Sequence, residues 1–275
     1  MRKPLLFILA FTTLLAAACT DGQARYGAPA DEPARQVDIG AALGVSDLSI
    51  VGVTVEPTSE RVLLLDANRG IYELADEGAV TLVWANETER YGVFTGTPWT
   101  DLVALEDGVF ALTTLSDGYL LNLGEDTLIQ HFCYEPGWEE EPPLEPAVAQ
   151  ITDAVAYDAQ NDLIYAQPRT VTDNLVDVLD SNLALYDRTT GADLNWVQFD
   201  VDYHAGAMAM EDQDNILLAV GSRIDRYTNG PNTTRFAMDL RSHGVTDIQG
   251  MAIHPRSGNL LVVDGATQTL FEIER

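Results

Sequence analysis

From about residue 40 to its end, the chain alternates short apolar runs with short polar turns. The runs are rich in valine, isoleucine, leucine and aromatic residues, and Gly, Pro, Asn and Asp separate them. Runs of this kind are typical of β-strands bounded by turns. None carries a sustained 3.6-residue apolar period, so the pattern predicts an all-β protein without a long helix.

The strand pattern repeats along the chain. Residues 44–66 and 244–264 share one plan: a Gly-Val-Ser/Thr-Asp start, a short apolar strand, a polar turn and a second apolar strand. The second strand ends in Asp66 in one copy and in Asp264 in the other, and a third strand follows each. The unit recurs with first strands near residues 100, 152 and 206. A fourth strand follows each of the first four units, at residues 79–84, 127–132, 195–199 and 234–238.

Four strands in each repeat of roughly 40 to 50 residues are typical of a β-propeller. We therefore predict a five-bladed β-propeller over residues 35–275. A six-bladed ring is the alternative. If the similar segments are not structural repeats, a β-sandwich or two small β domains are the other interpretations. The fifth repeat has three strands before Arg275 ends the chain. We expect residues 35–40 to supply its outer strand, because pairing the two ends of the chain removes an exposed sheet edge.

Residues 1–18 have the pattern of a secretory leader. Arg2 and Lys3 precede an apolar run at residues 4–15, and three alanines precede Cys19. A basic start, a short apolar stretch and small residues at the cleavage site define such a leader. A membrane-spanning helix needs about 20 apolar residues, so this run is too short.

The Ala-Ala-Ala-Cys ending resembles the lipobox of bacterial lipoproteins. The resemblance implies a lipid on Cys19, a flexible tether over residues 19–34 and a place in the bacterial cell envelope. Thr20, which stands where Asp would favour the inner membrane, favours the outer membrane, facing the periplasm or the exterior. A secreted protein cleaved near Ala18 is the alternative.

The chain is strongly acidic, with 43 Asp and Glu against 15 Lys and Arg and a formal net charge of -28. Lys3 is its only lysine, so cleavage of the leader leaves no lysine amine for Schiff-base chemistry. The charge repels nucleic acid and anionic lipid, and it favours cationic partners. An adaptation to salt would explain the same composition without any ligand.

The segment Gly250-Met-Ala-Ile-His-Pro255, with the strands 260–264 and 269–273, resembles a blade of the NHL and SMP-30 propellers. The resemblance spans residues 35–275. SMP-30-type lactonases hold Ca²⁺ through Glu, Asn, Asn and Asp near the starts of inner strands. The matching positions here contain no Asn, and no Glu-Gly-Pro motif opens the first repeat, so that ligand set is not transferred. These positions are Val51, Asp101, Asp153, Gly206 and Gln249.

Two groups of residues are candidates for a site. Four aspartates stand at the starts of first strands and could hold Ca²⁺, or each could bond a nearby N–H in an Asx-turn. They are Asp47, Asp101, Asp153 and Asp247. Long loops at residues 134–146 and 168–181 could form an acidic, aromatic binding face. A solvated acidic loop that binds nothing would have the same sequence pattern. The candidates on that face are Tyr134, Trp138, Glu139, Glu140, Glu141 and His204.

No hydrolase, zincin or P-loop motif occurs in the chain. Cys133 remains alone once Cys19 carries lipid, and it reads as a packed residue. The sequence favours a non-enzymatic binding or scaffold propeller that takes a protein, a peptide or a small cationic ligand. A Ca²⁺-dependent hydrolase or lactonase and an accessory subunit of an envelope complex are the alternatives.

Overall fold

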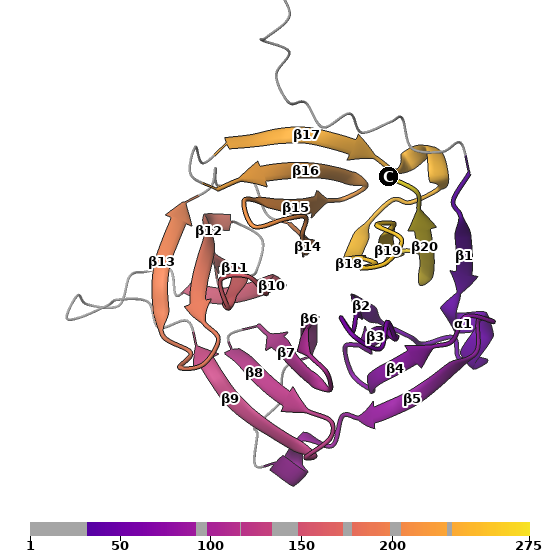
Figure 1. Cartoon of the computed structure of the whole chain (residues 1–275), viewed down its shortest axis with the longest axis horizontal. Helices are drawn as coiled ribbons and strands as arrows, with labels where there is room; N and C mark the ends of the chain where they lie inside the picture. Colours follow the sequence, from indigo (N-terminus) through magenta and orange to yellow (C-terminus); the bar gives the residue numbers. More distant parts are fainter. Residues whose placement is uncertain are drawn as a thin grey trace, which may run out of the picture.

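The computed structural model describes residues 32–91, 98–115, 117–133, 148–172, 178–198, 205–229 and 233–275. They form five four-stranded antiparallel sheets around one axis, which is a five-bladed β-propeller (Figure 1). This confirms the predicted fold class and number of blades. The helices in the described ranges are short: α1 (Ile39–Leu43), η1 (Thr88–Tyr91) and η2 (Arg241–His243). None of these is long and apolar enough to span a membrane.

In blades 1 to 4 the strands follow chain order from the axis outwards. Blade 1 contains β2 (Ile50–Val55), β3 (Val62–Asp66), β4 (Gly70–Leu74) and β5 (Val80–Ala85). Blade 2 contains β6 (Trp99–Glu106), β7 (Val109–Thr114), β8 (Asp117–Asn122) and β9 (Thr127–Cys133). Blade 3 contains β10 (Val148–Asp158), β11 (Leu163–Thr172), β12 (Val178–Asp187) and β13 (Asp193–Gln198). Blade 4 contains β14 (Ala207–Met210), β15 (Asn215–Val220), β16 (Arg223–Thr228) and β17 (Thr233–Asp239).

Blade 5 joins the two ends of the chain. Its strands are β18 (Ile248–Ile253), β19 (Leu260–Asp264), β20 (Thr269–Ile273) and, on the outside, β1 (Arg35–Asp38). β1 runs antiparallel to β20, with Arg35 opposite Glu272 and Asp38 opposite Thr269. Arg35 also donates from Nη2 to the carbonyl oxygen of Ala75 in blade 1, at 2.7 Å. The predicted closure of the ring by the N-terminal segment is confirmed.

The second long loop predicted for blade 3 is largely strand. β11 continues to Thr172 and β12 starts at Val178, so paired backbone covers most of residues 168–181. Pro168 suggested a loop, but it lies opposite Thr152, beside a register shift of β10 between Thr152 and Val155. Proline, which lacks an N–H, is tolerated in strands at such irregularities.

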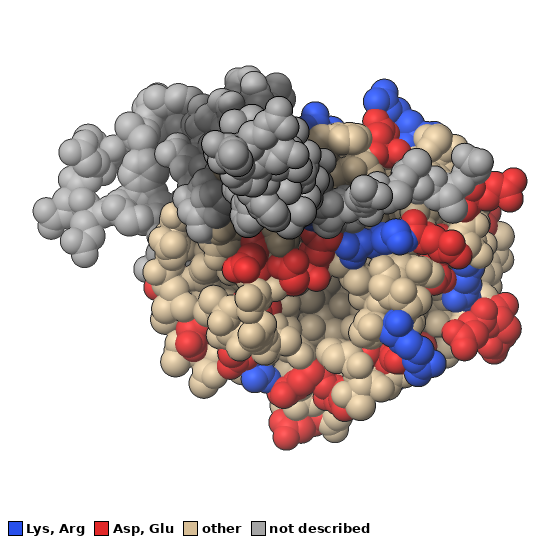
Figure 2. Space-filling view, turned by 45° about the horizontal axis from the view of Figure 1, so that its top comes forward, with Lys and Arg blue, Asp and Glu red and all other residues tan. Residues whose placement is uncertain are grey.

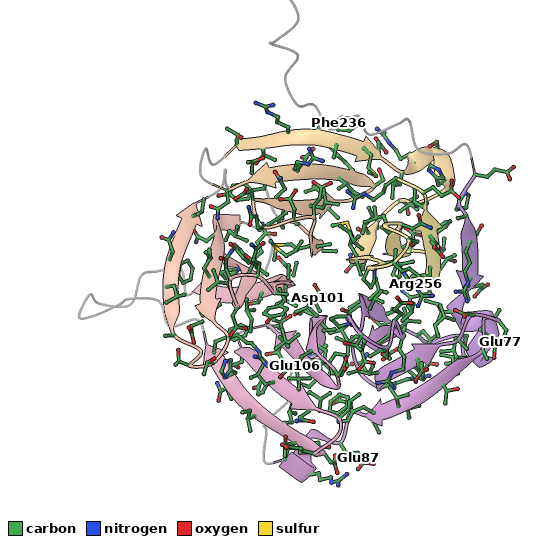
Figure 3. All side chains as sticks on the ribbon, in the orientation of Figure 1. Glu77, Glu87, Asp101, Glu106, Phe236 and Arg256 are labelled. Atoms are coloured by element: carbon green, nitrogen blue, oxygen red, sulfur yellow. The ribbon has the colours of Figure 1, made fainter. Side chains whose placement is uncertain are left out.

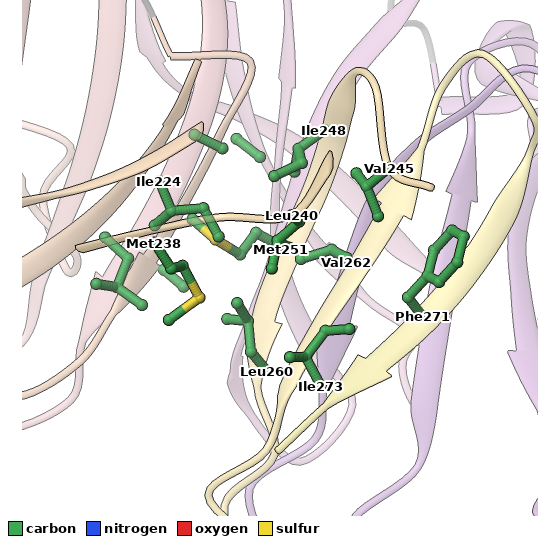
Figure 4. Close-up of a cluster of buried hydrophobic side chains, with 14 residues drawn as sticks. Ile224, Met238, Leu240, Val245, Ile248, Met251, Leu260, Val262, Phe271 and Ile273 are labelled. Carbon is green, nitrogen blue, oxygen red and sulfur yellow. The ribbon is translucent and has the colours of Figure 1, made fainter. Parts of the chain in front are cut away.

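Apolar clusters between neighbouring blades form the core. Between blades 4 and 5, Met238, Ile248, Leu260 and Phe271 are each at most 5% exposed (Figure 4). The contacts come from alternate residues of facing sheets, since side chains of a strand point to its two faces in turn. Each blade is therefore held by the two that flank it.

Buried polar side chains also link the inner strands. The Thr54 hydroxyl of β2 accepts a hydrogen bond from the Ala104 N–H of β6 at 2.9 Å. The Asp101 carboxyl group of β6 accepts from its neighbour Leu102 at 2.8 Å and from the Val155 N–H of β10 at 2.9 Å. Burial raises the pKa of Asp101 well above its usual value, although these two N–H groups oppose the effect.

We predict that removing residues 1–38 destabilises the ring, because β20 becomes an exposed edge. Each lost backbone hydrogen bond costs about 1 kcal/mol, and each kcal/mol lowers the melting temperature by roughly 2–4 °C in a domain of this size. Thermal unfolding of the variant that lacks residues 1–38 should be compared with that of a variant starting at residue 32, which keeps β1. Equal melting temperatures would contradict a role of β1 in closing the ring.

We also predict that Asp101→Asn changes how stability depends on pH. A carboxyl group whose pKa is raised by folding binds its proton more tightly in the folded state, so stability falls as pH rises above the unfolded pKa near 4. The variant loses this titration. Its melting temperature relative to the wild type should therefore increase from pH 4 towards neutrality. Glu77→Gln, at an exposed carboxylate, is the control with a flat difference, and a flat difference for Asp101→Asn would contradict the prediction.

Candidate functional site

A cavity of about 510 Å³ opens on the axis at the end of the ring where the inner strands start. Its walls come from residues that lead into β2, β6, β14 and β18, and from the turns after β3 and β15. A smaller cavity of about 120 Å³, lined by apolar strand residues such as Val55 and Met210, lies at the other end. We call the larger one the axial cavity.

Two of the predicted aspartates, Asp153 and Asp247, line the axial cavity. Asp153 lies between Thr152 and Val155, where the register of β10 shifts, and such irregularities redirect side chains near binding sites. The Asp247 carboxylate accepts a hydrogen bond from the side-chain nitrogen of Gln249 at 2.9 Å. Both aspartates are partly exposed as residues, although the Oδ2 atom of Asp153 is buried.

The other two predicted aspartates lie elsewhere. Asp47 is 78% exposed and pairs with Arg69 Nη2 at 2.6 Å, and the hydrogen bond from Arg69 lowers the pKa of Asp47. Asp101 lies at the inner edge of the ring (Figure 3) and is 2% exposed. Each of its carboxyl oxygens accepts a hydrogen bond from a main-chain N–H group. The four side chains therefore do not meet at one point.

The described residues do not fit a calcium set of the SMP-30 type. Among the matching positions, Val51 and Gly206 have no side-chain oxygen, and Asp101 is already bonded within the ring. Across the described ranges, no three His, Cys, Asp or Glu residues gather as metal ligands. Ca²⁺ needs several converging oxygen ligands, which Asp153, Asp247 and Gln249 alone do not form.

The aspartates that end the second strands have a structural role. Asp264 accepts from the main-chain N–H groups of Thr246 and Asp247, both at 2.8 Å, and from the Thr267 hydroxyl at 2.7 Å. Burial by itself would raise the pKa of Asp264, but these hydrogen bonds outweigh it and the pKa is lowered. In blade 1, Asp66 likewise accepts from the N–H groups of Ser49 and Arg69, both at 2.9 Å. These bonds fix the starts of the inner strands of blades 1 and 5, and with them part of the wall of the cavity.

Several cavity residues were not predicted. Asn68, Thr100 and Gln249 add amide and hydroxyl groups to the wall. Trp99 also lines it, is 1% exposed and leaves its indole N–H without a hydrogen-bond partner. The sequence signals their place only through the repeat, since each lies near the start of an inner strand or in a turn after a second strand.

The remaining candidates lie outside the described residues: Cys19, Tyr134, Trp138, Glu139, Glu140, Glu141 and His204. On the described surface, Asp and Glu side chains are spread over the face seen in Figure 2. The described residues that line the axial cavity include two carboxylates and no Arg or His. Its chemistry is therefore that of hydrogen-bond acceptors beside negative charge.

No protein-family model matches the chain, and no curated protein matches it. Among solved structures, a gluconolactonase from Xanthomonas campestris is similar at 12% identity, with a TM-score of 0.51 over 81% of this chain and 71% of the other. A chain in a mitotic checkpoint complex aligns at 11% identity with a TM-score of 0.48, over 100% of this chain and 99% of the other. At such low identity the likeness to the gluconolactonase shows the fold alone. The chain is thus a five-bladed β-propeller with a gluconolactonase among its structural neighbours.

Proposed function

We propose that the protein is a binding protein of the bacterial envelope that holds a small cationic ligand in its axial cavity. The observation that carries the proposal is the pair Asp153 and Asp247 in a cavity of about 510 Å³ whose described lining has no basic residue. Small-molecule sites typically measure about 300–1,000 Å³ and use a few well-placed polar groups.

The chemistry of the wall supports a cation with N–H groups. Carboxylates form charge-assisted hydrogen bonds with ammonium or guanidinium groups, and these are about twice as strong as neutral ones. Asn68, Thr100 and Gln249 can accept further hydrogen bonds or donate to polar atoms of the ligand. The net charge of -28 adds long-range attraction for a cation at low salt.

The N-terminal sequence supports the location. The basic start, the apolar run and the alanines before Cys19 have the features of a lipoprotein leader. A lipid on Cys19 would hold the propeller at a membrane, and Thr20 favours the outer one. The membrane is then a partner through the lipid alone.

A Ca²⁺-dependent lactonase is the second candidate, because the gluconolactonase shares the propeller fold. It would need a set of oxygen ligands that the described residues do not bring together. An accessory subunit would need one apolar face. The large apolar side chains that are exposed lie instead on the outer strands of four different blades: Leu82, Ile129, Leu194 and Phe236.

We predict that small organic cations with N–H groups, such as putrescine or agmatine, raise the melting temperature of the purified protein, because a ligand that binds only the folded state stabilises it. Asp247→Asn should weaken the apparent affinity about tenfold or more, since a hydrogen bond to a charged group contributes about 1.5–3 kcal/mol. Asp47→Asn is the matched control, at the equivalent repeat position but outside the cavity. Equal losses of apparent affinity in both variants would show attraction to the overall charge and would contradict binding in the axial cavity.

A second prediction separates binding from metal-dependent hydrolysis. With ionic strength matched, melting curves in EDTA, millimolar Mg²⁺ and millimolar Ca²⁺ should coincide, because screening of a polyanion does not distinguish the two ions. A rise specific to Ca²⁺ that Asp153→Asn abolishes would support the hydrolase instead.

A further inference from the structure

The first half of the outer strand of blade 4 is open on both faces. Thr233, Thr234, Arg235 and Phe236 of β17 are all exposed, so neither face of this half of the strand is covered. Residues 193–195 of β13 are exposed as well, whereas Leu128 of β9 and Trp84 of β5 are buried. Phe236 is 60% exposed, more than the large apolar residues exposed on the other outer strands.

The backbone of this segment has one edge without a described neighbour. β17 is the last strand of its sheet, and among the described strands it pairs only with β16. From Thr233 to Phe236 the register is regular, and the irregularity comes only beyond Phe236. An outer strand with a regular, unpaired edge is a template for a further strand.

The edge is also basic in an acidic protein. Among the described residues Arg235 has no hydrogen-bond or ion-pair partner, whereas each of the other arginines with a described side chain binds a carboxylate or, for Arg35, a carbonyl oxygen. Its cross-strand neighbour is Arg226, which pairs with Glu211 and offers Arg235 no negative charge. On the other face, the Arg223 guanidinium lies 5.5 Å from the centre of the Phe236 ring and keeps that ring in place.

We propose that the exposed edge of β17, residues Thr233–Phe236, binds an extended acidic segment of a partner protein as a fifth strand of blade 4. Main-chain hydrogen bonds would supply affinity, and alternate side chains would supply specificity. Because successive residues point to opposite faces, the segment would set an apolar side chain beside Phe236 and a carboxylate beside Arg235.

A second copy of this chain fits the edge less well. Each copy is strongly acidic, so two copies repel one another. Two β17 strands would also bring a second Arg235 to an edge that already has Arg226 across the sheet. An acidic segment neutralises this charge, whereas a second copy adds to it.

The test uses two capped peptides of about ten residues, one alternating Glu with Val and one alternating Lys with Val. The net charge of the protein favours the Lys peptide, so tighter binding of the Glu peptide at 0.15 M salt, where distant charges are screened, would reveal the local site. Fluorescence anisotropy with the full purified protein should show that preference. Arg235→Glu should weaken binding of the Glu peptide about tenfold or more, and Phe236→Ala should weaken it several-fold.

Two controls make the result specific. Ile129→Ala removes a side chain that is 55% exposed on the outer strand of blade 2, and it should leave binding within twofold. Methylation of every peptide nitrogen, which prevents strand pairing on both edges of the peptide, should abolish binding. Ile129→Glu places the same negative side chain on the outer strand of blade 2, and equal losses of binding in Arg235→Glu and Ile129→Glu would overturn the proposal. Tighter binding of the Lys peptide, or unchanged binding of the methylated peptide, would also overturn it. Melting curves of the variants verify that each is folded.

Discussion

The structure depends on the packing of five inner strands around one narrow axis. At the closest points the backbones touch: a Cβ atom on Gly250 would lie 2.7 Å from the Val53 nitrogen, and one on Gly52 would lie 2.7 Å from a carboxyl oxygen of Asp101. Any side chain at these positions would force the strands apart, since interiors pack without spare space. The axis therefore opens only at its two ends, and this explains both the cavity above the contact and the complete burial of Asp101 beside it.

Arginine–carboxylate pairs occur at both ends of the ring, but no described arginine lines the axial cavity. At the end away from the axial cavity, arginine–glutamate pairs join neighbouring blades through Glu60 and Arg256, Glu106 and Arg188, and Glu211 and Arg275. With Lys3 as the only lysine, arginine supplies nearly all positive charge, and these contacts use part of a small supply. At the cavity end, hydrogen bonds to Asp66 and Asp264 hold the loops without a cation in the wall. Asp153 and Asp247 therefore line a cavity whose described wall contains no arginine.

The repeat made the fold predictable, because each blade needs the same short strands, and blades 1 and 5 also share the aspartate that fixes the start of the inner strand. The site was harder, because identical local sequence leads to different contacts. Asp47 and Asp247 hold the same repeat position, yet Arg69, three residues after Asp66, draws Asp47 outwards. In blade 5 the residue three after Asp264 is Thr267, which bonds Asp264 instead and leaves Asp247 at the cavity. The burial of Asp101 depends on Gly52 and Val155 in other blades, and no pattern near Asp101 signals them.

The path of the chain also sets the end of the ring at which a membrane tether would join it. β20 runs from the cavity end of the ring to the opposite end, and β1 pairs with it antiparallel, starting where Arg35 lies opposite Glu272. The chain therefore joins the ring at the end away from the axial cavity. A tether over residues 19–34 with a lipid on Cys19, as proposed, would attach the membrane on that side. The axial cavity opens at the opposite end, where a soluble cationic ligand could enter it, and β17 lies on the outer rim of the ring (Figure 1).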